Sequence, residues 1–596
     1  MSSVSGVACR GDLEKRVNMK ARRFAALGAI LLSTTALTGV VAGTAHGENP
    51  NLGKSAHGHM DNGKSLPHVS GASEVTFDEE RALGADAQSA GSADLPPDAT
   101  ASALGCANRG SVTNPRVNQD CTSRRQAEEQ VAVNPRDATN VIAGQNDSRI
   151  GFNHCGFDYS LNGGGTFGDG IPPFFQHVNP GTGHTYDAAS DPNVTFNGAG
   201  VAWYSCVVFD VNTNASGLLA VPSTLGLKGS AYANVPAGPS KYVVAETNDG
   251  HTFYDKQFMA GDPRTGQSSV YVTFTVFTSD QKCSKGNNPG AYCSSEIFYS
   301  KWDDATQKWS PIANVSGTSP LCTGGNTFDK KAPADACNFD QGSMPVVNPA
   351  DGSVFVVWNN GNTPTALNQT LGRRIGSDGK MGPVVKVGQD NEANNALCDF
   401  GRGPEECVKS LNVRTNDFPA IAVDPTNPSH LVSVWQDSRH SAPGAGTYDV
   451  VVSDSKNGGQ TWSDADGGGT VLDGASGEAL SQPSVAVTQT GTTAVSFYRA
   501  NAYTGSAIGG GTFGYGMRVR PASSGSFGKD SPLSDRQNYP SPQSNPTQAG
   551  FLGDYSSIAA SPAPRSNVVH AVWADTRNSS AVGGPDEDVF MATVSP

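Results

Sequence analysis

The stretch DFPAIAVDPTNPSHLVSVWQDSR (residues 417–439) places two short apolar segments on either side of a turn rich in Pro, Asn and Asp. β-Branched residues alternate along both segments, which is the pattern of a β-hairpin. Its ending, Trp-x-Asp-x-Arg, recurs as AVWADTR (571–577) and, with Gln in place of Trp, as AGQNDSR (143–149). The stretch therefore predicts a strand pair and also a unit that the chain repeats.

The hairpin pattern starts seven times, roughly 60–85 residues apart. Its copies cover residues 128–149, 190–210, 255–276, 340–360, 417–439, 481–499 and 554–577. Such repetition is typical of a β-propeller. We predict an all-β propeller of four-stranded blades, six or seven in number, with seven favoured by the count. Only three strands are visible in the last copy, so we expect residues 106–125 to supply the fourth and close the ring.

Composition and the N-terminus indicate an exported protein. The 596 residues include 70 Gly and 37 Pro, and the formal charge of −14 disfavours a nucleic-acid partner. A basic start at Met19, an apolar run and small residues near Ala45 predict a secretory signal peptide, preceded by an upstream extension. The predicted organisation is extension and signal over 1–45, a disordered leader or pro-segment over 46–105, and a propeller over 106–596. The expected location is extracellular.

Cysteine usage is consistent with export. After Cys9, ten cysteines remain, and an even number in an exported chain predicts disulfides. Close spacing favours pairs between sequence neighbours, such as Cys283 with Cys293 and Cys398 with Cys407. No C-x-x-C occurs, which disfavours a zinc knuckle. We expect no cofactor, although structural calcium is conceivable at an Asp-rich loop such as GGPDEDVF (583–590).

A second repeated phrase occurs as SLNGGGTF (160–167), ETNDGHTF (246–253) and SKNGGQTW (455–462). The short polar residue can bond the following backbone, glycine takes the left-handed position, and the aromatic ring packs beneath. These phrases resemble the Asp-boxes (BNR repeats) of the sialidase-like β-propeller superfamily, with Asn162, Asn248 and Asn457 in the acidic position and Glu246 in the hydroxyl position. The resemblance implies a structural role for them.

The same resemblance implies a site at the central face. DYSSIAASPAPRSNVVHAVW resembles the last-blade segment that carries the sialidase nucleophile, which makes Tyr555 the catalytic candidate, with Asp554 or Asp417 as its carboxylate partner. Arginines in that family hold a substrate carboxylate. The candidates for substrate binding here are Arg149, Arg439, Arg499 and Arg577. These assignments imply a glycan-directed hydrolase, an exo-glycosidase or exo-sialidase, acting as a monomer on carbohydrate or glycoconjugate.

The chain also departs from the sialidase pattern. Sialidases carry Arg-Ile-Pro where this chain has Asp417, Phe418 and Pro419, so the arginine triad is incomplete. The first-strand starts are mostly acidic, which suits a neutral glycoside, a cation or a basic group better than a carboxylated sugar. They are Glu128, Glu129, Asp255, Lys256, Asp340, Asp417, Asp554 and Tyr555. Two alternatives stay open: a non-catalytic propeller that binds glycans or proteins, and a structural role for Trp-x-Asp-x-Arg.

Overall fold

The computed structural model describes most of the chain beyond residue 110. The described residues are 69–70, 73, 110–120, 122, 125–211, 215–236, 239–279, 293–365, 367–392, 394–400, 404–473, 477–502, 511–540, 551–579 and 585–596. The predicted signal peptide, most of the predicted leader, Cys283 and part of the Asp-rich loop at 583–590 lie outside them. No helix among the described residues is long and apolar enough to cross a membrane.

The first four sheets are antiparallel meanders in chain order. They consist of β1 (Gln126–Asn134), β2 (Asp137–Asp147), β3 (His154–Ser160) and β4 (Gly168–Gly170); β5 (Ala188–Phe196), β6 (Ala202–Phe209), β7 (Ser216–Pro222) and β8 (Val243–Thr247); β9 (Thr252–Gly261), β10 (Val270–Thr278), β11 (Ser294–Asp303), β12 (Lys308–Trp309) and β13 (Ala313–Asn314); and β14 (Asp340–Val347), β15 (Val354–Asn360), β16 (Asn368–Ile375) and β17 (Met381–Asp390).

The remaining sheets follow the same order, apart from one small insertion. They consist of β18 (Leu397–Asp399), β19 (Pro404–Val408) and β20 (Val413–Arg414), which form the insertion; β21 (Ala420–Val423), β22 (Leu431–Asp437), β23 (Asp449–Ser455) and β24 (Thr470–Leu472); β25 (Ala479–Val487), β26 (Thr493–Ala500), β27 (Phe513–Arg520) and β28 (Ser531–Pro532); and β29 (Ser557–Ala560), β30 (Val569–Ser579) and β31 (Pro585–Val594). Short 3₁₀ turns lie at Pro173–Gln176 and Leu225–Leu227.

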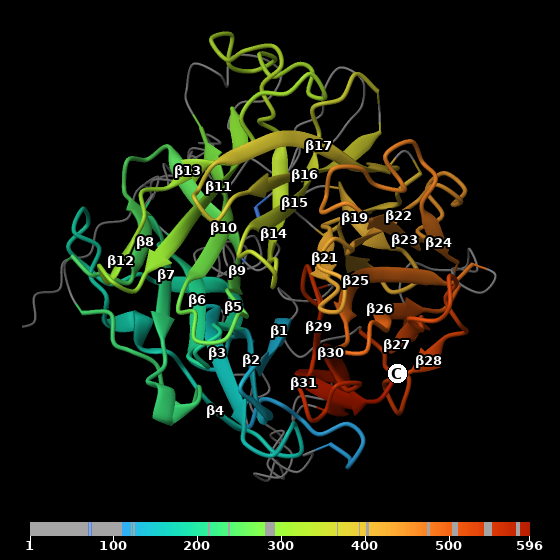
Figure 1. Cartoon of the computed structure of the whole chain (residues 1–596), viewed down its shortest axis with the longest axis horizontal. Coiled ribbons are helices and arrows are strands. Elements are labelled where there is room, and N and C mark those ends of the chain that lie inside the picture. The colour runs from blue at the N-terminus through green and yellow to red at the C-terminus, as the bar shows by residue number, and fades with distance from the viewer. Residues whose placement is uncertain are drawn as a thin grey trace, which may run out of the picture. The chain divides into compact units, whose positions relative to one another are not determined.

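The sheets succeed one another around a common centre (Figure 1). The first strands β1, β5, β9, β14, β21, β25 and β29 contact one another in that order, and β29 contacts β1. Pro115–Val117 pairs with β31, where Val117 N donates to Val589 O at 2.8 Å. The prediction that this segment extends the last sheet is confirmed, as is the all-β class. The arrangement is consistent with a β-propeller.

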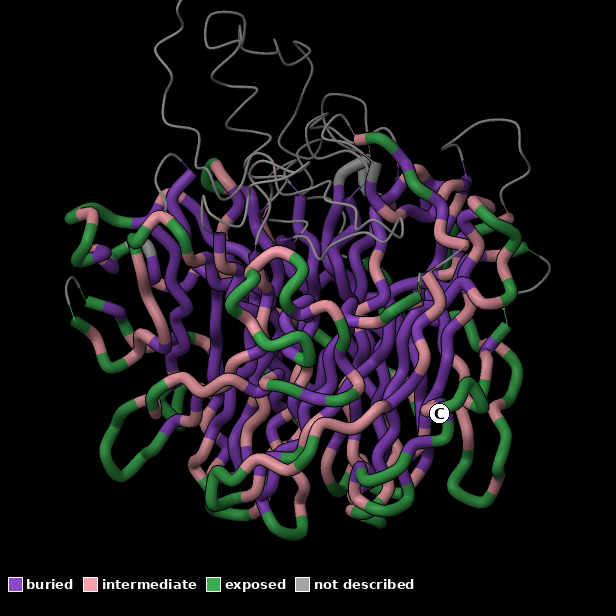
Figure 2. Tube along the Cα trace, turned by 90° about the horizontal axis from the view of Figure 1, so that it is seen from above, coloured by how far each residue is buried: buried purple, intermediate pink, exposed green. Residues whose placement is uncertain are grey.

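The core lies between the sheets, because the second strands are largely buried on both faces. β6, β15 and β22 are buried along their whole length. Trp358, Trp435 and Trp573 are fully buried on β15, β22 and β30. Figure 2 shows the strands as buried runs and places most exposed residues in the turns. Full burial of both faces explains why these strands lack polar alternation.

Close packing between sheets predicts a strong effect of one methyl group. A Cβ added to Gly388 on β17 would lie 2.1 Å from the Trp435 ring. We expect Gly388→Ala to lower the free energy of unfolding by about 2 kcal/mol, because either the backbone or the buried indole must move. Urea denaturation measures the effect. Gly226→Ala is the control, since a Cβ there meets no atom within 4 Å; equal stability of the two variants would contradict this account.

Three disulfides join described cysteines: Cys155–Cys206, Cys322–Cys337 and Cys398–Cys407. The prediction that Cys398 pairs with Cys407 is confirmed. Cys293 is also disulfide-bonded. These bonds are consistent with an oxidising, extracellular compartment.

The turns of the second phrase carry a repeated hydrogen-bond pattern. Gly164 N donates to Ser160 Oγ at 3.0 Å, and Thr166 N donates to Asn162 Oδ1 at 3.0 Å. The turn at 455–462 makes the same bonds through Ser455 and Asn457. At 246–253 the expected assignment is wrong by one residue. Thr247 and Asp249, rather than Glu246 and Asn248, accept the bonds, because this turn is one residue shorter.

Candidate active site

Irregular first strands direct one side chain each toward the centre. Pairing with the second strand skips two residues in β1, β5, β14 and β25, and a similar irregularity lies between β9 and β10. In all five strands, the residue two positions before the next paired residue has a positive φ. Phe418 and Tyr555 hold the equivalent positions before β21 and β29. We call this set the inner ring: Glu128, Asp191, Lys256, Gly342, Phe418, Gln482 and Tyr555.

Left-handed backbone at a non-glycine residue costs about 1 kcal/mol or more. Glu128, Asp191 and Lys256 adopt φ values of 59°, 55° and 53°. Bulges of this kind re-aim a side chain that a regular strand would send to a sheet face. Strain repeated at the same position of several sheets therefore marks the inner ring as the candidate site.

Lys256 is the centre of the inner ring. Its ammonium is fully buried and lies 3.4 Å from Glu128, 3.2 Å from Asp191 and 3.0 Å from Asp554. The pKa of Lys256 is raised because the attraction of these carboxylates outweighs burial, which alone would lower it. Burial raises the pKa of Glu128, and Lys256 opposes that shift. The cluster therefore contains three carboxyl groups around one ammonium, all of them buried.

Tyr555 lies against this cluster. Its ring centroid is 4.3 Å from Lys256 Nζ, and Phe258 packs edge-on at 5.0 Å. Its hydroxyl donates to Pro192 O at 3.3 Å. Burial, followed by the charge of Glu128, raises the pKa of Tyr555. The phenol is therefore neutral and needs a neighbouring base before it can act as a nucleophile.

Asp554 connects the inner ring to an arginine that sequence reasoning missed. Arg414 on β20 contacts Asp554 and pairs with Glu405 at 2.8 Å. Nothing in the hairpin pattern points to Arg414, because it lies in the inserted sheet β18–β20. Asp191 was also missed as a site residue, although it opens the weakest hairpin copy. Lys256 and Glu128 were visible among the first-strand starts.

A short part of the predicted leader lies on this face. Ser70 N donates to Asp255 Oδ2 at 2.7 Å, and Ser73 Oγ lies 3.0 Å from Ser190 Oγ. Val69 is fully buried in an apolar cluster with residues that include Phe209, Phe253 and Phe277. Arg414 donates to Val69 O at 3.4 Å. These contacts place Val69, Ser70 and Ser73 beside the inner ring.

The predicted substrate-binding arginines do not meet at the inner ring. Arg149 pairs with Asp147 at 2.5 Å, Arg439 with Asp437 at 2.9 Å and Arg577 with Asp575 at 2.7 Å. In each case the backbone N–H of the arginine also donates a hydrogen bond to the same aspartate. Arg499 pairs with Glu478 at 2.8 Å. This local pairing agrees with the structural interpretation of Trp-x-Asp-x-Arg, and substrate binding by these residues stays a prediction.

Asp417 lies in a second acidic group rather than in the inner ring. One oxygen each of Asp390, Glu392 and Asp417 lie within 4.8 Å of one another, in an arrangement that could hold a metal ion. Burial, followed by Glu406, raises the pKa of Asp417. Asn416 connects the two groups, because its side-chain amide donates to Asp554 O at 3.0 Å.

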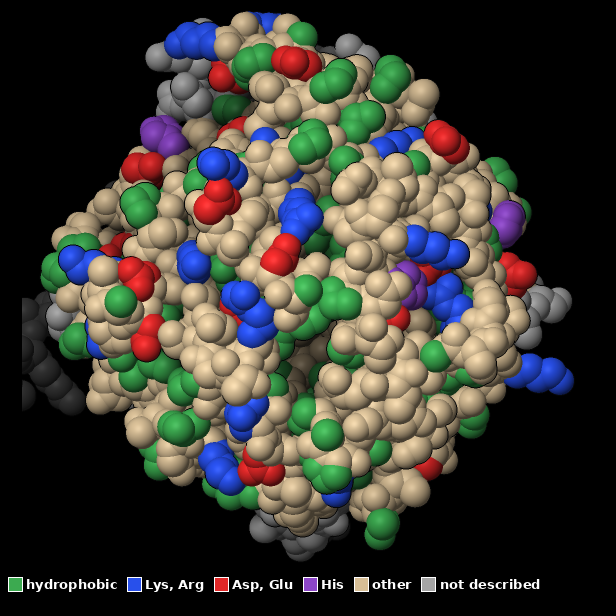
Figure 3. Space-filling model, viewed as in Figure 1, with side chains coloured by type: hydrophobic (Ala, Val, Ile, Leu, Met, Phe, Trp, Pro, Cys, Tyr) green, Lys and Arg blue, Asp and Glu red, His purple; other side chains and the backbone are tan. Residues whose placement is uncertain are grey.

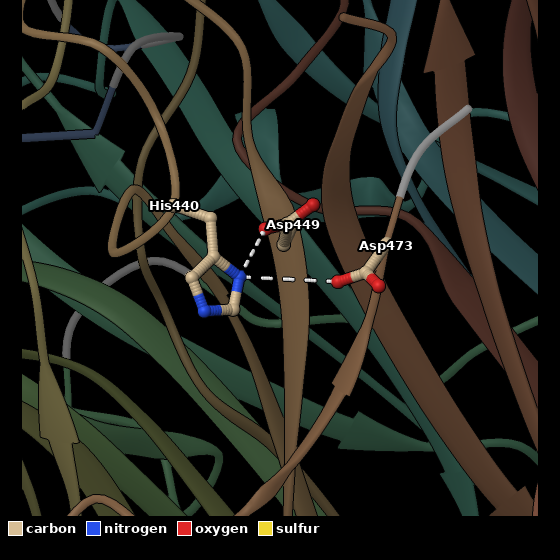
Figure 4. A group of neighbouring side chains, drawn as sticks. All are labelled: His440, Asp449 and Asp473. Atoms are coloured by element: carbon tan, nitrogen blue, oxygen red, sulfur yellow. Dashed lines mark hydrogen bonds and ion pairs between the residues drawn. The ribbon is translucent and has the colours of Figure 1, made fainter. Parts of the chain in front are cut away.

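An exposed group offers another possible metal site. His440, Asp449 and Asp473 line a pocket of about 340 Å³. Figure 4 shows the imidazole facing both carboxylates, with Nδ1 3.1 Å from Asp449 Oδ2 and 3.9 Å from Asp473 Oδ1. The side chains of His440 and Asp473 are 59 % and 72 % exposed. Solvent competes strongly for groups this exposed.

A larger pocket of about 620 Å³ is lined by turns of the β21–β24 and β25–β28 sheets. His430 Nε2 lies 2.8 Å from Asp454, which also pairs with Arg520 at 2.6 Å. On the face drawn in Figure 3, basic and acidic side chains are interspersed around a hollow near the centre. Within this pocket, Asp454 balances the positive charge of Arg520.

The His430 contacts predict a pH dependence of stability. The hydrogen bond to Asp454 raises the pKa of His430 although burial opposes it. Its contribution is therefore complete below the ordinary histidine pKa of about 6.5 and is lost as pH rises through the higher folded-state value. We expect His430→Gln to destabilise the protein by about 1 kcal/mol near pH 5 and by less near pH 8. Urea titrations at both pH values measure this, and a pH-independent difference would contradict it.

Comparison with known proteins gives structural matches only. No protein-family model and no curated protein sequence matches the chain. An α-L-arabinanase from Penicillium chrysogenum matches at 11 % identity and TM-score 0.36, over 68 % of this chain and 92 % of that one. A leech intramolecular trans-sialidase matches at 12 % and 0.37, over 82 % and 70 %. The Hadza microbial sialidase Hz136 matches at 11 % and 0.37, over 68 % and 65 %. Similarity this low carries no inference about activity.

Proposed function

We propose that this chain is a secreted glycan-directed hydrolase with seven blades whose active site is the inner ring. The observation that carries the proposal is the juxtaposition of Tyr555 and Asp554 with Lys256, Glu128 and Asp191, of which the last three hold strained backbone positions. A nucleophile and carboxyl groups in one cluster are the groups that glycoside hydrolysis requires.

The proposed roles follow from charge. Tyr555 Oη attacks the anomeric carbon and gives its proton to Glu128, whose raised pKa favours proton uptake. The glycosidic C–O bond breaks, and Glu128 passes this proton to the departing oxygen of the aglycone. Water then displaces the tyrosine and releases the sugar. Asp554 is held by Lys256 and Arg414 and stabilises positive charge developing on the sugar ring. The surplus of carboxylates favours a neutral glycoside over a carboxylated one.

The activity test uses the chain from residue 46 after proteolytic removal of residues 46–105, with fluorogenic neutral glycosides and sialosides as substrates. Turnover of a neutral glycoside that is lost in Tyr555→Phe, with an unchanged melting temperature, supports the proposal. The matched control is Tyr539→Phe, because Tyr539 is 56 % exposed. Absence of turnover on every substrate, or equal turnover by wild type and Tyr555→Phe, contradicts the proposed mechanism.

We further propose that residues 46–105 are a pro-segment, of which Val69, Ser70 and Ser73 cover the inner ring. Val69→Asp should release it, because burying one valine side chain contributes about 1.5 kcal/mol, equivalent to roughly a tenfold change in opening. We expect proteolysis of the leader to accelerate by about that factor. The control is Val112→Asp, since Val112 is exposed. Unchanged proteolysis of Val69→Asp would contradict the covering role.

A second candidate function is a non-catalytic propeller that binds glycans or proteins. The favouring observation is that Lys256, Glu128 and Asp191 are fully buried and paired with one another, as in a structural core. Glycan-array binding that persists in Tyr555→Phe, without turnover, would identify this function.

A further inference from the structure

The carboxylate cluster beside the inner ring consists of Asp390, Glu392, Glu406 and Asp417. It joins the end of β17, the loop after it, the inserted strand β19 and the segment before β21. One oxygen each of Asp390, Glu392 and Asp417 lie within 4.8 Å of one another. Three acidic groups thus converge at one point, and Gln436 links Glu406 to Asp417.

Nearby amide groups donate hydrogen bonds to these carboxylates but do not neutralise their charge. Gln436 donates to Glu406 at 2.6 Å and to Asp417 at 3.4 Å, and Asn395 donates to Asp417 at 3.4 Å. Asn359 donates to Asp390 Oδ2. Each amide is neutral, so these bonds orient the carboxylates without balancing their charge.

Two oxygens at the cluster lack a hydrogen-bond donor. Asp390 is fully buried, and its Oδ1 has no hydrogen-bond partner among the described residues. The same holds for Oδ1 of Asn395, whose amide nitrogen already contacts Asp417. A buried acceptor without a donor is costly, and a bound cation removes that cost.

The arginines closest to the cluster are committed to other carboxylates. Arg439 pairs with Asp437 at 2.9 Å and with Asp464 at 3.0 Å. Arg414 pairs with Glu405 and Asp554. Within the described part of the chain, no lysine or arginine forms an ion pair with Asp390, Glu406 or Asp417. A bound cation would supply positive charge that these ion pairs do not.

We propose that the carboxylate cluster binds one Ca²⁺ ion, with Asp390, Glu392 and Asp417 as ligands and Glu406 and Asn395 Oδ1 completing the oxygen set. All candidate donors are oxygens, which hard cations prefer, and neither histidine nor cysteine takes part. Several carboxylates and an amide on separate segments suit the larger and more flexible coordination of Ca²⁺ better than the strict octahedron of Mg²⁺. The ion would join the inserted sheet β18–β20 to β17 and to the inner ring.

The test compares metal content and melting temperature of the full mature chain. After EGTA treatment and dialysis against Ca²⁺, the wild type should retain about one equivalent of calcium and melt at least about 2 °C higher than the metal-free protein. Mg²⁺ at the same concentration should give a smaller shift. Absence of calcium retention, or an equal shift with Mg²⁺, overturns the assignment.

Asp390→Asn should affect the melting temperature differently in the metal-free and the calcium-bound protein. Without metal it should melt at or above wild type, because it removes one of several repelling charges; with Ca²⁺ it should melt below wild type and lose the calcium-induced shift. Glu392→Gln provides the same comparison if Asp390→Asn does not fold. The matched control is His440→Ala at the exposed His440 group, which should keep the full shift. Loss of the shift in His440→Ala and its retention in Asp390→Asn would place the site elsewhere.

Discussion

Lys256→Met is expected to lower the free energy of unfolding by about 3–5 kcal/mol, because it leaves a buried carboxylate cluster without its cation. Methionine keeps most of the volume of the side chain, so lost packing contributes little. Glu128, Asp191 and Asp554 would then face one another within a site that excludes water. Chemical denaturation near neutral pH measures the change.

The loss should become smaller at low pH. Burial already raises the pKa of Glu128, and the absence of Lys256 would raise it further. A raised folded-state pKa contributes stability below the unfolded value and loses it as pH rises, so the variant should be relatively more stable near pH 5 than near pH 8. Lys308→Met is the control because Lys308 is exposed. A loss below about 1 kcal/mol at both pH values would show that groups other than Lys256 offset the repulsion among the carboxylates.

Asp575→Ala is expected to destabilise the protein by about 3 kcal/mol or more. Asp575 accepts bonds from Trp573 Nε1 at 3.0 Å and Asn538 at 3.0 Å, and it holds the Arg577 guanidinium at 2.7 Å. The Arg577 side chain is only 1 % exposed, so the substitution leaves a buried charge with one remaining partner, Asp535. Denaturant titration measures the loss.

Asp535→Ala is the matched control for Asp575→Ala, because it removes the other partner of the same guanidinium. Asp535 is 30 % exposed and water can replace it, so we expect a loss of about 1 kcal/mol or less. Equal losses in the two variants would mean that the Trp-x-Asp-x-Arg ending is not the structural clamp inferred here.

Local patterns predicted the elements of this fold well. Alternating apolar residues and Pro, Asn and Gly turns located the first hairpin of the seven large sheets but not the inserted sheet β18–β20. Strand pairing across a short turn depends on adjacent residues, which is why these hairpins were predictable. The pairing of Arg577 with Asp575 was likewise accessible as an alternative, since only two positions separate them. The turn at 246–253 was misassigned by one residue because its loop is shorter, which composition does not reveal.

The candidate site was only partly predictable for a physical reason. Lys256 lies 65, 128 and 298 positions from Asp191, Glu128 and Asp554, and only the closure of successive first strands brings these residues together. Backbone bulges then turn the inner-ring side chains inward, and an inserted sheet contributes Arg414. The sequence alone determined repeated hairpins and their turn chemistry, because these are short-range interactions. The tertiary structure decided which charges meet, because burial and long-range closure set the partners of each side chain.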